Sequence, residues 1–589
     1  MPAVSGPWFQ GRKSRETDVV IYGGGAGGLC AGIQASRLGA DVILLEPSPW
    51  VGGMLTAAGV SALDGNEHGA GGGLVQQFRQ ELVDHYGSLD ALFTGWVSRY
   101  CYEPHVGQRI LERWVEEAAN LTVHRGVEAV SYERVDRRTR RIGVAPTQIE
   151  LEPACREAER TITCRVFIDA TEYGDGLALA SLPYFLGRES RDMLGEPAAP
   201  PEQDENIQDL AYCATLVREP GAEPPSASPM ERAQWDQFQC SVEADCTTPD
   251  EELLGHELHD WESFIGYAAL PNDKYLLNWP HNANGFSVTP GFFEDRYVRY
   301  QRLQDAKRHT LQYLKYMQTE LGHPEWQIAT GEYPTDDNLP PLPYIRESRR
   351  LVKDQMVTQQ DVVPEADQPR APTIDDSIAV GDYFIDHWHG EEHLPPGCRL
   401  GEDYPDNAPF QVPASVFFPD QDDLSFLVGE KSIAVSHIAN GCTRLQPVVM
   451  LMGQALGIYA ALGKEEGKPP RDVDVDRVQE TLLDAGCQLY IMYDVPAGDD
   501  LFRPVQELAL HGILQDDDPT ELEPDEPMPA RWAHRWGERA DMPSDAVRQE
   551  EGPLQLQNLG SELQAHLPEE PTVKRGDFVK ALHTHVEAA

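Results

Sequence analysis

The chain has 589 residues and a formal net charge of −49, from 97 acidic and 48 basic side chains. This length predicts two or three domains, and so negative a surface argues against nucleic acid as a partner. Because the acidic residues are spread along the chain, we interpret them as a solvated acidic surface, as in organisms with a salty cytosol. The alternative, steering of a cationic substrate, would require the acidity to surround one cleft.

Targeting and metal-binding signals are weak. Residues 1–16 contain basic side chains but no apolar segment or small-residue cleavage site, so no signal peptide is expected. The sequence contains no run of about 18 apolar residues that could span a membrane. We therefore expect a cytoplasmic protein without a membrane partner. The ten cysteines form no C-x-x-C pair and no Cys/His cluster at zinc spacing. We therefore expect no metal site, and reduced, buried thiols.

The first element is an apolar run at residues 18–22 (DVVIY), followed by a glycine-rich turn and a helical segment at residues 29–38. Strand, turn and helix in this order favour a dinucleotide, because glycines permit the tight turn, the approach of a diphosphate and close packing of the helix. The amides at the helix start attract phosphate groups. The residues expected to contribute are Gly23, Gly25, Ala26, Gly27 and Gly28.

The next strand, residues 41–45, ends at Glu46, whose carboxylate is expected to accept hydrogen bonds from ribose hydroxyls and to repel a 2′-phosphate. NAD and FAD both fit this pattern. Six residues later Gly52 and Gly53 precede Met54. A glycine pair here favours FAD, because the chain passes close to the diphosphate and ribityl chain, where only glycine leaves room. We expect all three residues to contact the cofactor.

With these motifs the sequence resembles the large family of FAD-dependent oxidoreductases. Residues 166–176 (VFIDATEYGDG) look like the strand and ATG-type motif of that family. The resemblance places Ala170 and Thr171 near the dinucleotide, although Glu172 stands where many members have glycine. The segment from Glu103 to Val130, which includes Val127, resembles the part that covers the adenine.

The resemblance continues late in the chain. Residues 424–429 (LSFLVG) form an expected strand that reaches Glu430, and residues 436–446 lead into a helix expected from Pro447 to Leu462. Proline suits the first helical position. The positive end of the helix dipole would lie near the N1/C2 region of a reduced flavin. Gly453 and Gly457 are expected to let this helix pack closely against the sheet. The cofactor contacts implied here are Gly429, Glu430, Gln446 and Pro447.

Several internal blocks are similar to one bacterial subgroup of the family, whose members often carry the label "xanthan lyase". The blocks are residues 278–280, 334–337, 344–350, 381–389 and 443–447, and the resemblance covers about residues 18–515. The label carries little weight, because a lyase needs no flavin scaffold.

The resemblance and the order of elements imply an α/β fold. A discontinuous Rossmann-like FAD-binding domain is expected from residues 18–215 and 375–470, with an inserted α+β substrate domain at 216–374. Residues 474–589 are expected to form a C-terminal helical and acidic extension.

The residues expected to do chemistry lie in three of these blocks. His387 and His389, beside Asp386, can take a proton near neutral pH. Arg346 and Arg349 suit a carboxylate or phosphate group. Alternatively, one histidine is structural, and the arginines form ion pairs with neighbours such as Glu347.

Two further residues are expected near the substrate. Arg444 is predicted near the substrate or the flavin pyrimidine. Tyr383 is the last of the expected catalytic residues. In the alternative hypothesis, a polysaccharide lyase, Tyr383 would belong to the lyase site.

We therefore predict an FAD-dependent dehydrogenase or oxidase that transfers a hydride between a small polar substrate and flavin N5. The substrate is expected to resemble a carbohydrate or to bear a carboxylate, and the sequence does not identify the electron acceptor. Two alternatives stay open, namely a polysaccharide lyase in which His387, Tyr383 and the arginines act, and a non-catalytic nucleotide-binding protein. His68 is the one residue considered for covalent attachment of the flavin.

Overall fold

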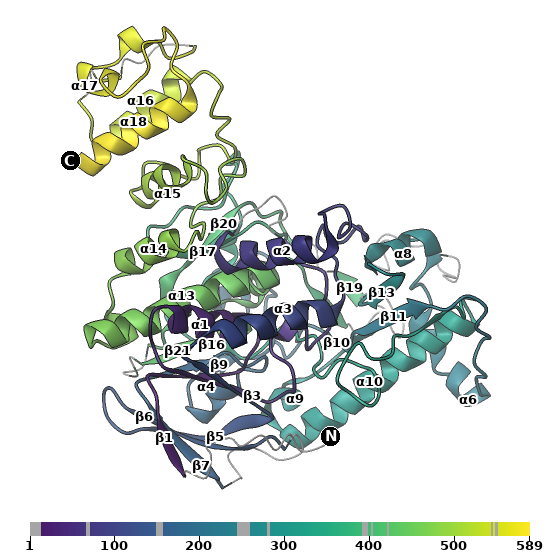
Figure 1. Ribbon diagram of the computed structural model, residues 1–589. Helices are drawn as coiled ribbons and strands as arrows, with labels where there is room; N and C mark the ends of the chain where they lie inside the picture. The colour runs from purple at the N-terminus through teal and green to yellow at the C-terminus, as the bar shows by residue number, and fades with distance from the viewer. Residues whose placement is uncertain are drawn as a thin grey trace.

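The computed structural model describes residues 13–65, 71–148, 157–243, 259–279, 283–390, 399–401, 404–420, 423, 425–543, 546–547 and 552–588. His68, Pro280 and Cys398 lie outside these residues. The chain forms a large body with a smaller C-terminal lobe of helices above it (Figure 1).

A five-stranded parallel sheet in the order β21-β8-β2-β3-β4 lies at the centre of the body. Its strands are β2 (Val19–Tyr22), β3 (Val42–Glu46), β4 (Leu121–Arg125), β8 (Val166–Asp169) and β21 (Phe426–Val428). All except β4 are buried along their whole length, as expected of parallel strands covered on both faces. The edge strand β21 comes from the last third of the chain, so the fold is discontinuous as predicted.

Helices α1 (Ala26–Arg37) and α13 (Gln446–Glu466) pack closely against each other. A Cβ atom on Gly453 would lie 2.2 Å from the carbonyl oxygen of Gly27, and one on Gly457 would lie 2.4 Å from that of Ala31. The expectation that these glycines face the sheet is therefore wrong. They face α1, because two helices can approach this closely only where one of them lacks side chains.

Helix α13 begins one residue earlier than predicted, at Gln446, with Leu445 as its N-cap. Pro447 is thus the second helical residue. The first-turn amides have no partner inside a helix, so proline is tolerated there too. By length and composition α13 is the one described helix that could cross a membrane, and it is wholly buried inside the protein.

A second sheet, in the order β1-β7-β6-β5, lies beside the parallel sheet. Its strands are β1 (Ser14–Glu16), β5 (Val127–Arg134), β6 (Arg140–Pro146) and β7 (Arg160–Cys164). Helices α2 (Gly73–Tyr86) and α3 (Pro104–Glu117) contact each other, and α2 also contacts α13. Helix α3 is the one expected through Trp114.

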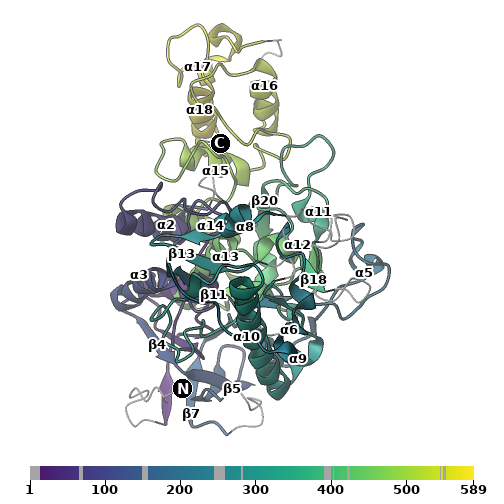
Figure 2. The same ribbon diagram turned by 90° about the vertical axis from the view of Figure 1, so that its right-hand side faces the viewer.

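The segment predicted as the inserted domain contains a four-stranded antiparallel sheet in the order β12-β13-β11-β15. Its strands are β11 (Ala214–Arg218), β12 (Ala269–Leu270), β13 (Lys274–Leu277) and β15 (Trp326–Ile328). The long helix α10 (Arg296–Thr319) runs next to this sheet (Figures 1 and 2). The shorter helices of this region include α6 (Pro229–Arg232), α8 (Trp261–Tyr267), α9 (Pro290–Glu294) and α11 (Gln359–Val362).

The C-terminal part consists of α14 (Val475–Asp484), α15 (Phe502–Leu510), α16 (Ala530–Arg539), α17 (Ser561–Gln564) and α18 (Arg575–Ala588). Buried Arg370 attaches it to the body. The guanidinium donates to the carbonyl oxygens of Ile491 and Pro519 at 2.9 and 2.6 Å and lies 4.0 Å from the ring centre of Tyr490.

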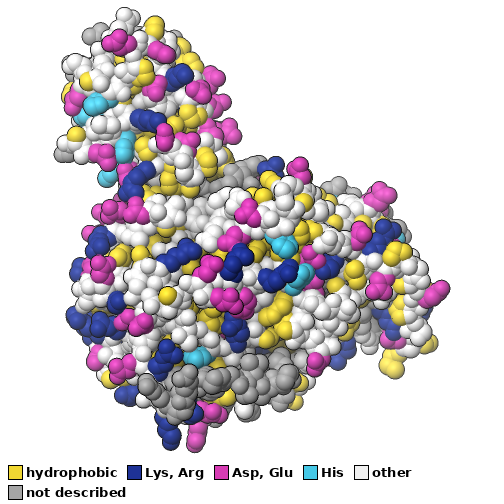
Figure 3. Space-filling model, viewed as in Figure 1, with side chains coloured by type: hydrophobic (Ala, Val, Ile, Leu, Met, Phe, Trp, Pro, Cys, Tyr) yellow, Lys and Arg dark blue, Asp and Glu magenta, His cyan; other side chains and the backbone are white. Residues whose placement is uncertain are grey.

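Most cysteines behave as predicted. Six are free and buried, namely Cys30, Cys101, Cys164, Cys213, Cys442 and Cys487. Cys240 is an exception because it is disulfide-bonded, so the expectation of reduced thiols throughout is wrong. On the face drawn in Figure 3, acidic and basic side chains are interspersed over the body and the C-terminal lobe.

Candidate functional site

The glycine turn after β2 forms a narrow cradle at the carboxyl end of the parallel sheet. Gly23 has a φ of +99°, and a Cβ there would lie 2.1 Å from the carbonyl oxygen of Ala170. A Cβ on Gly53 would lie 2.8 Å from the Cα of Gly25. Two loops thus approach each other so closely that only glycine fits at their contact.

The side chain of Glu430, from late in the chain, lies against the first turn of α1. Its Oε1 accepts hydrogen bonds from the amides of Gly27 and Gly28 at 2.7 and 3.1 Å. Its φ of 53° is unusual for a residue with a side chain. Burial, and next the nearby charge of Glu172, raise the pKa of Glu430 to about 8.

Glu172, the departure from the family pattern, forms a buried ion pair with Lys431. One oxygen of the Glu172 carboxylate pairs with the ammonium group. The other, Oε1, and Oε2 of Glu430 have no hydrogen-bond partner among the described residues. Glu172 Oε1 also lies 2.4 Å from where a Cβ on Gly53 would be, so it is directed between the two loops.

Glu46 lies at the carboxyl end of β3, as predicted. Its Oε2 accepts from the amide of Gly24 at 2.7 Å and its Oε1 from the amide of Ser48 at 2.6 Å. Burial raises the pKa of Glu46 to about 7. Each oxygen keeps a second lone pair, so the carboxylate can still accept from a ribose hydroxyl.

The remaining residues predicted to bind the cofactor surround this cradle. Gly52 and Gly53 both have positive φ, and Gly53 begins a short 3-10 helix with Met54. Ala170 and Thr171 follow β8, and the Thr171 hydroxyl donates to Asp169 at 2.8 Å.

The other predicted contacts lie on neighbouring elements. Val127 is buried at the start of β5. The amide of Gly429 donates to the carbonyl oxygen of Asp169 at 2.7 Å, which places β21 and Glu430 beside the ATG-type motif.

These features fit FAD. Amides in the first turn of a helix bind phosphate groups, and because Glu430 takes the amides of Gly27 and Gly28, those of Gly25 and Ala26 are the ones open to a phosphate. The glycine contact leaves room for a diphosphate chain, and unpartnered carboxylate oxygens of Glu172 and Glu430 can accept from ribityl or ribose hydroxyls. A Cβ on Gly27 would lie 3.0 Å from the carbonyl oxygen of Val449. The cradle therefore lies within one turn of the N-terminus of α13.

Polar side chains gather at that N-terminus. Arg444 donates to the Asp386 carboxylate at 2.6 Å and to the hydroxyl of Tyr344. Trp388 donates to the other oxygen of Asp386 at 2.7 Å. Gln446 donates to the carbonyl oxygen of Ala62 at 3.0 Å, which ties the loop after the glycine pair to this end of the helix.

We call this group of side chains the Arg444 cluster. Its members are Asp64, Tyr344, Arg346, Tyr383, Asp386 and Arg444. The Arg346 guanidinium lies 4.7 Å from the ring centre of Tyr344. Burial, and then the charges of Asp64 and Asp386, raise the pKa of Tyr383. Two arginines, two carboxylates and two phenols thus lie close enough to influence one another, at the end of the cradle.

His387 and His389 are buried next to this cluster. His387 Nε2 lies 3.1 Å from the carbonyl oxygen of Ile438, and Nδ1 lies 3.2 Å from His389 Nε2. Since a carbonyl oxygen only accepts, Nε2 of His387 carries the proton, and Nδ1 accepts from His389. Burial lowers the pKa of both imidazoles well below its ordinary value. The prediction that they transfer protons stays a prediction.

Arg349 lies elsewhere. It donates to Asp175 at 2.9 Å and to the carbonyl oxygen of Tyr173 at 2.7 Å. Arg296 and Arg299 pair with the same Asp175 carboxylate. Although burial raises the pKa of Asp175, these guanidinium groups outweigh it and hold the pKa well below its usual range. The structure therefore brings Arg346 and Arg444 together but places Arg349 in a separate buried network.

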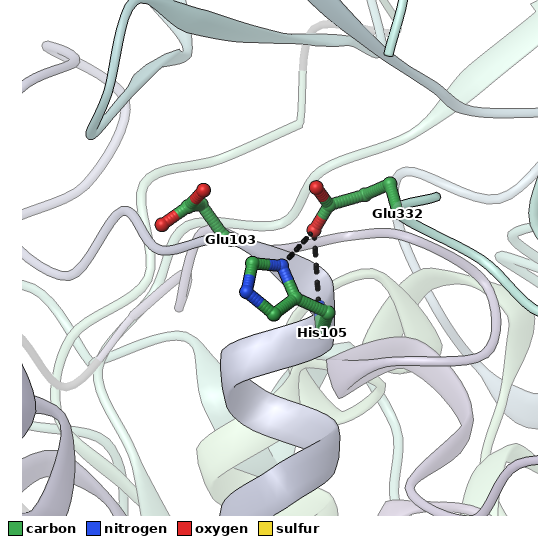
Figure 4. Close-up of side chains that lie close together, drawn as sticks. All are labelled: Glu103, His105 and Glu332. Atoms are coloured by element: carbon green, nitrogen blue, oxygen red, sulfur yellow. Dashed lines mark hydrogen bonds and ion pairs between the residues drawn. The ribbon is translucent and has the colours of Figure 1, made fainter. Parts of the chain in front are cut away.

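One group of possible metal ligands, Glu103, His105 and Glu332, lies at the start of α3 (Figure 4). Lys274 bonds to both carboxylates, at 2.7 Å from Glu332. Although burial raises the pKa of Glu332, hydrogen bonds from His105 and Lys274 lower it to about 2. The carboxylates are thus paired with a cation of the chain, and we interpret the group as a salt-bridge cluster that joins α3 to β13.

The fold and the cradle define a protein that binds a flavin dinucleotide. The sequence model of the FAD dependent oxidoreductase family matches residues 18–482. The chain belongs to this family of oxidoreductases, and FAD is its cofactor. A search of curated proteins gave no match.

Solved structures similar to this chain include flavin enzymes. p-Nitrophenol 4-monooxygenase PnpA from Pseudomonas putida DLL-E4 is 10% identical, with a TM-score of 0.22, over 35% of this chain and 48% of its own. The flavin-dependent monooxygenase PieE, solved with FAD and substrate, is 16% identical, with a TM-score of 0.23, over 35% and 36%. AlpK is 11% identical, with a TM-score of 0.31, over 84% and 72%. The chain spans less than half the length of the first two.

Sequence reasoning missed two members of the Arg444 cluster. Asp64 follows the glycine pair in a stretch without regular structure, and no motif distinguishes it. Tyr344 lies in a block that resembles the bacterial subgroup, but only the arginines of that block were singled out. The position of Asp386 next to His387 in the sequence suggests that it orients a histidine, whereas the structure pairs it with Arg444.

Proposed function

We propose that this oxidoreductase transfers a hydride between flavin N5 and a small polar substrate held by the Arg444 cluster. The observation that carries the proposal is the pairing of Arg444 with Asp386 and Tyr344 at the end of the dinucleotide cradle. The bound flavin supplies a two-electron acceptor.

The residues of the chain bind and orient the substrate. Arg444 and Arg346 give two buried positive charges, and a planar guanidinium suits a carboxylate or a pair of hydroxyl oxygens. Asp64 and Asp386 are acceptors for substrate hydroxyls. We propose a hydroxylated substrate of the carbohydrate or carboxylate type, because the cluster combines hydrogen-bond donors with acceptors.

A hydride leaves a hydroxyl-bearing carbon only if the hydroxyl proton also leaves, so one group must accept it. We propose that Nδ1 of His389, which has no hydrogen-bond partner among the described residues, receives this proton while Nε2 of His389 passes its own proton to Nδ1 of His387. Their buried, neutral imidazoles and the hydrogen bond between them support a short relay. A lyase would need no dinucleotide cradle. An oxidoreductase therefore explains both the cradle and the Arg444 cluster better than a lyase does.

The test is anaerobic mixing of the purified, flavin-loaded protein with sugar acids, amino acids and simple alcohols. Bleaching of the flavin absorbance by one of these classes is the expected result. Protein that is loaded with FAD but is not bleached by any of the three would contradict the proposal.

A further inference from the structure

A cavity of about 810 Å³ lies between the body and the C-terminal extension. Both parts of the chain line it, the body with Gln76, Arg99 and Tyr100 and the extension with Tyr493, Thr520 and Glu521 among others. A volume of this size is typical of sites for small molecules. In Figure 1 α15 and the lobe that contains α16 to α18 lie higher than α2, whose first turn contains Gln76.

Hydrogen bonds hold the walls of the cavity in place. Next to Gly72, which also lines the cavity, the amide of Gly73 donates to the carbonyl oxygen of Gly486 at 2.9 Å. The Tyr493 hydroxyl donates to Asp382 at 3.1 Å, which fixes the opposite wall to the body. Arg370 holds the two chain segments that carry Tyr493 and Thr520. A site with fixed walls loses little conformational entropy on binding.

Four polar side chains of the lining have no hydrogen bond or ion pair with any residue that the structure describes. They are the amide of Gln76, the guanidinium of Arg99 and the hydroxyls of Tyr100 and Thr520. Together they offer several donors and acceptors with two aromatic faces, from Tyr100 and Tyr493. Hydroxyl-rich ligands need this combination of short-range polar partners and flat apolar surfaces.

The charges of the lining limit the ligand further. Arg99 is its one cation. Asp494 already accepts from the amides of Leu522 and Glu523, at 2.8 and 2.6 Å, whereas Glu521 adds a negative charge. One carboxylate directed at Arg99 is therefore favoured, and a polyanion is not.

The cavity lies one layer of residues outside the Arg444 cluster. The carbonyl oxygen of Tyr100 accepts from the amide of Leu63 at 3.2 Å, directly before Asp64. Arg79 spans the same boundary, because its guanidinium lies 5.1 Å from the ring centre of Tyr100 and donates to the carbonyl oxygen of Gly65 at 3.3 Å. A Cβ on Gly65 would lie 3.0 Å from that of Tyr383.

We infer that this cavity binds the outer part of the substrate, a polyhydroxylated sugar acid whose carboxylate pairs with Arg99. The inference rests on the proposed function and gives the C-terminal extension a role in substrate selection. Gln76, Tyr100 and Thr520 contact the hydroxyls of this part of the substrate.

The experiment is calorimetric titration of the flavin-loaded full-length protein with sodium glucuronate, glucose and sodium hexanoate. Glucuronate should bind more tightly than glucose or hexanoate, because only glucuronate has both the carboxylate and the hydroxyls. Arg99→Gln should raise the Kd for glucuronate at least tenfold and leave that for glucose unchanged. Arg138→Gln, a change of an exposed arginine in the turn between β5 and β6, is the matched control and should bind like the parent.

Equal affinity of the parent and Arg99→Gln for glucuronate would overturn the inference, and so would no binding to the parent. Flavin bleaching in the same samples separates this result from the fate of the proposed function. If bleaching by sugar acids is unaffected by Arg99→Gln, the cavity is not the site but the oxidoreductase proposal stands. If binding depends on Arg99 but none of the tested classes bleaches the flavin, the cavity is supported and the proposed function fails.

Discussion

The guanidinium of Arg444 donates to the carboxylate of Asp386 at 2.6 Å, at the point where α12 (His437–Thr443) ends and α13 begins. The Arg444 side chain is fully buried and that of Asp386 is 17% exposed. Burial opposes the charge of Arg444, but Tyr344 and Asp386 together raise its pKa. A fixed positive charge therefore lies next to the end of the dinucleotide cradle.

Replacement of Arg444 should reduce turnover without loss of flavin. For Arg444→Lys we expect a fall in kcat/KM of roughly 10- to 100-fold, because one ammonium group cannot contact Asp386 and Tyr344 as a planar guanidinium does. Steady-state kinetics and the visible spectrum of the purified variant measure both quantities. Arg503→Lys, at an exposed position of α15, is the control and should match the parent. A variant that keeps full kcat/KM would remove Arg444 from the site.

The histidine pair gives a separate test of proton transfer. His387→Ala and His389→Ala should stay yellow and lose turnover by roughly 100-fold or more, the usual contribution of a general base. Because a purely structural role would also lower turnover, the pH profile of kcat is measured with His389→Gln. Loss of one limb of the profile supports proton transfer, whereas a profile of unchanged shape contradicts it, as would unimpaired turnover in both alanine variants.

The contact between the two glycine loops should control cofactor binding. A Cβ in Gly53→Ala would meet Glu172 Oε1 and the backbone of Gly25, and the residue would also have to keep a φ of +50°. We expect the Kd for FAD, measured by quenching of flavin fluorescence, to rise at least tenfold. In Gly291→Ala the nearest atom is 3.8 Å away, so this control should bind FAD normally. Equal affinities would mean that FAD does not pass between the loops.

The sequence predicted the cradle well because its pattern is local. The turn of Gly23, the acid Glu46 and the glycine pair are each determined by a few adjacent residues. The contacts of Gly453 could not be predicted, since the choice between the sheet and α1 depends on how distant elements pack.

The Arg444 cluster was predicted less completely for the same reason. The Arg444 cluster combines loops from four distant segments, and nothing near Asp64 or Tyr344 in the sequence indicates that they meet. Arg349 was selected as part of a local arginine run, yet only the fold shows that its partner is Asp175.

Arg349 should matter for stability more than for chemistry. Arg349→Met would leave the buried Asp175 carboxylate with fewer partners, which typically costs about 3–5 kcal/mol when a buried pair is broken. We expect a lower Tm by differential scanning fluorimetry, with a kcat near that of the parent at a temperature where the variant is folded. Arg308→Met, at an exposed position of α10, should leave the Tm unchanged. A normal Tm with lost turnover would instead place Arg349 at the site.

The stability of the protein prepared without FAD should depend on pH through Glu430. Its folded-state pKa of about 8 lies above the ordinary value for a glutamate, so the folded state holds a proton that the unfolded state releases. The contribution of this bound proton to the free energy of unfolding is fully present at low pH and is lost as the pH rises through about 8. Glu430→Gln imitates the protonated acid and should flatten the fall in Tm between pH 7 and 8 by a few degrees. Glu262→Gln, at an exposed position in α8, should keep the slope of the parent. If Glu430→Gln keeps that slope as well, the carboxylate of Glu430 does not lose a proton in this range, and repulsion from Glu172 is weaker than the buried geometry implies.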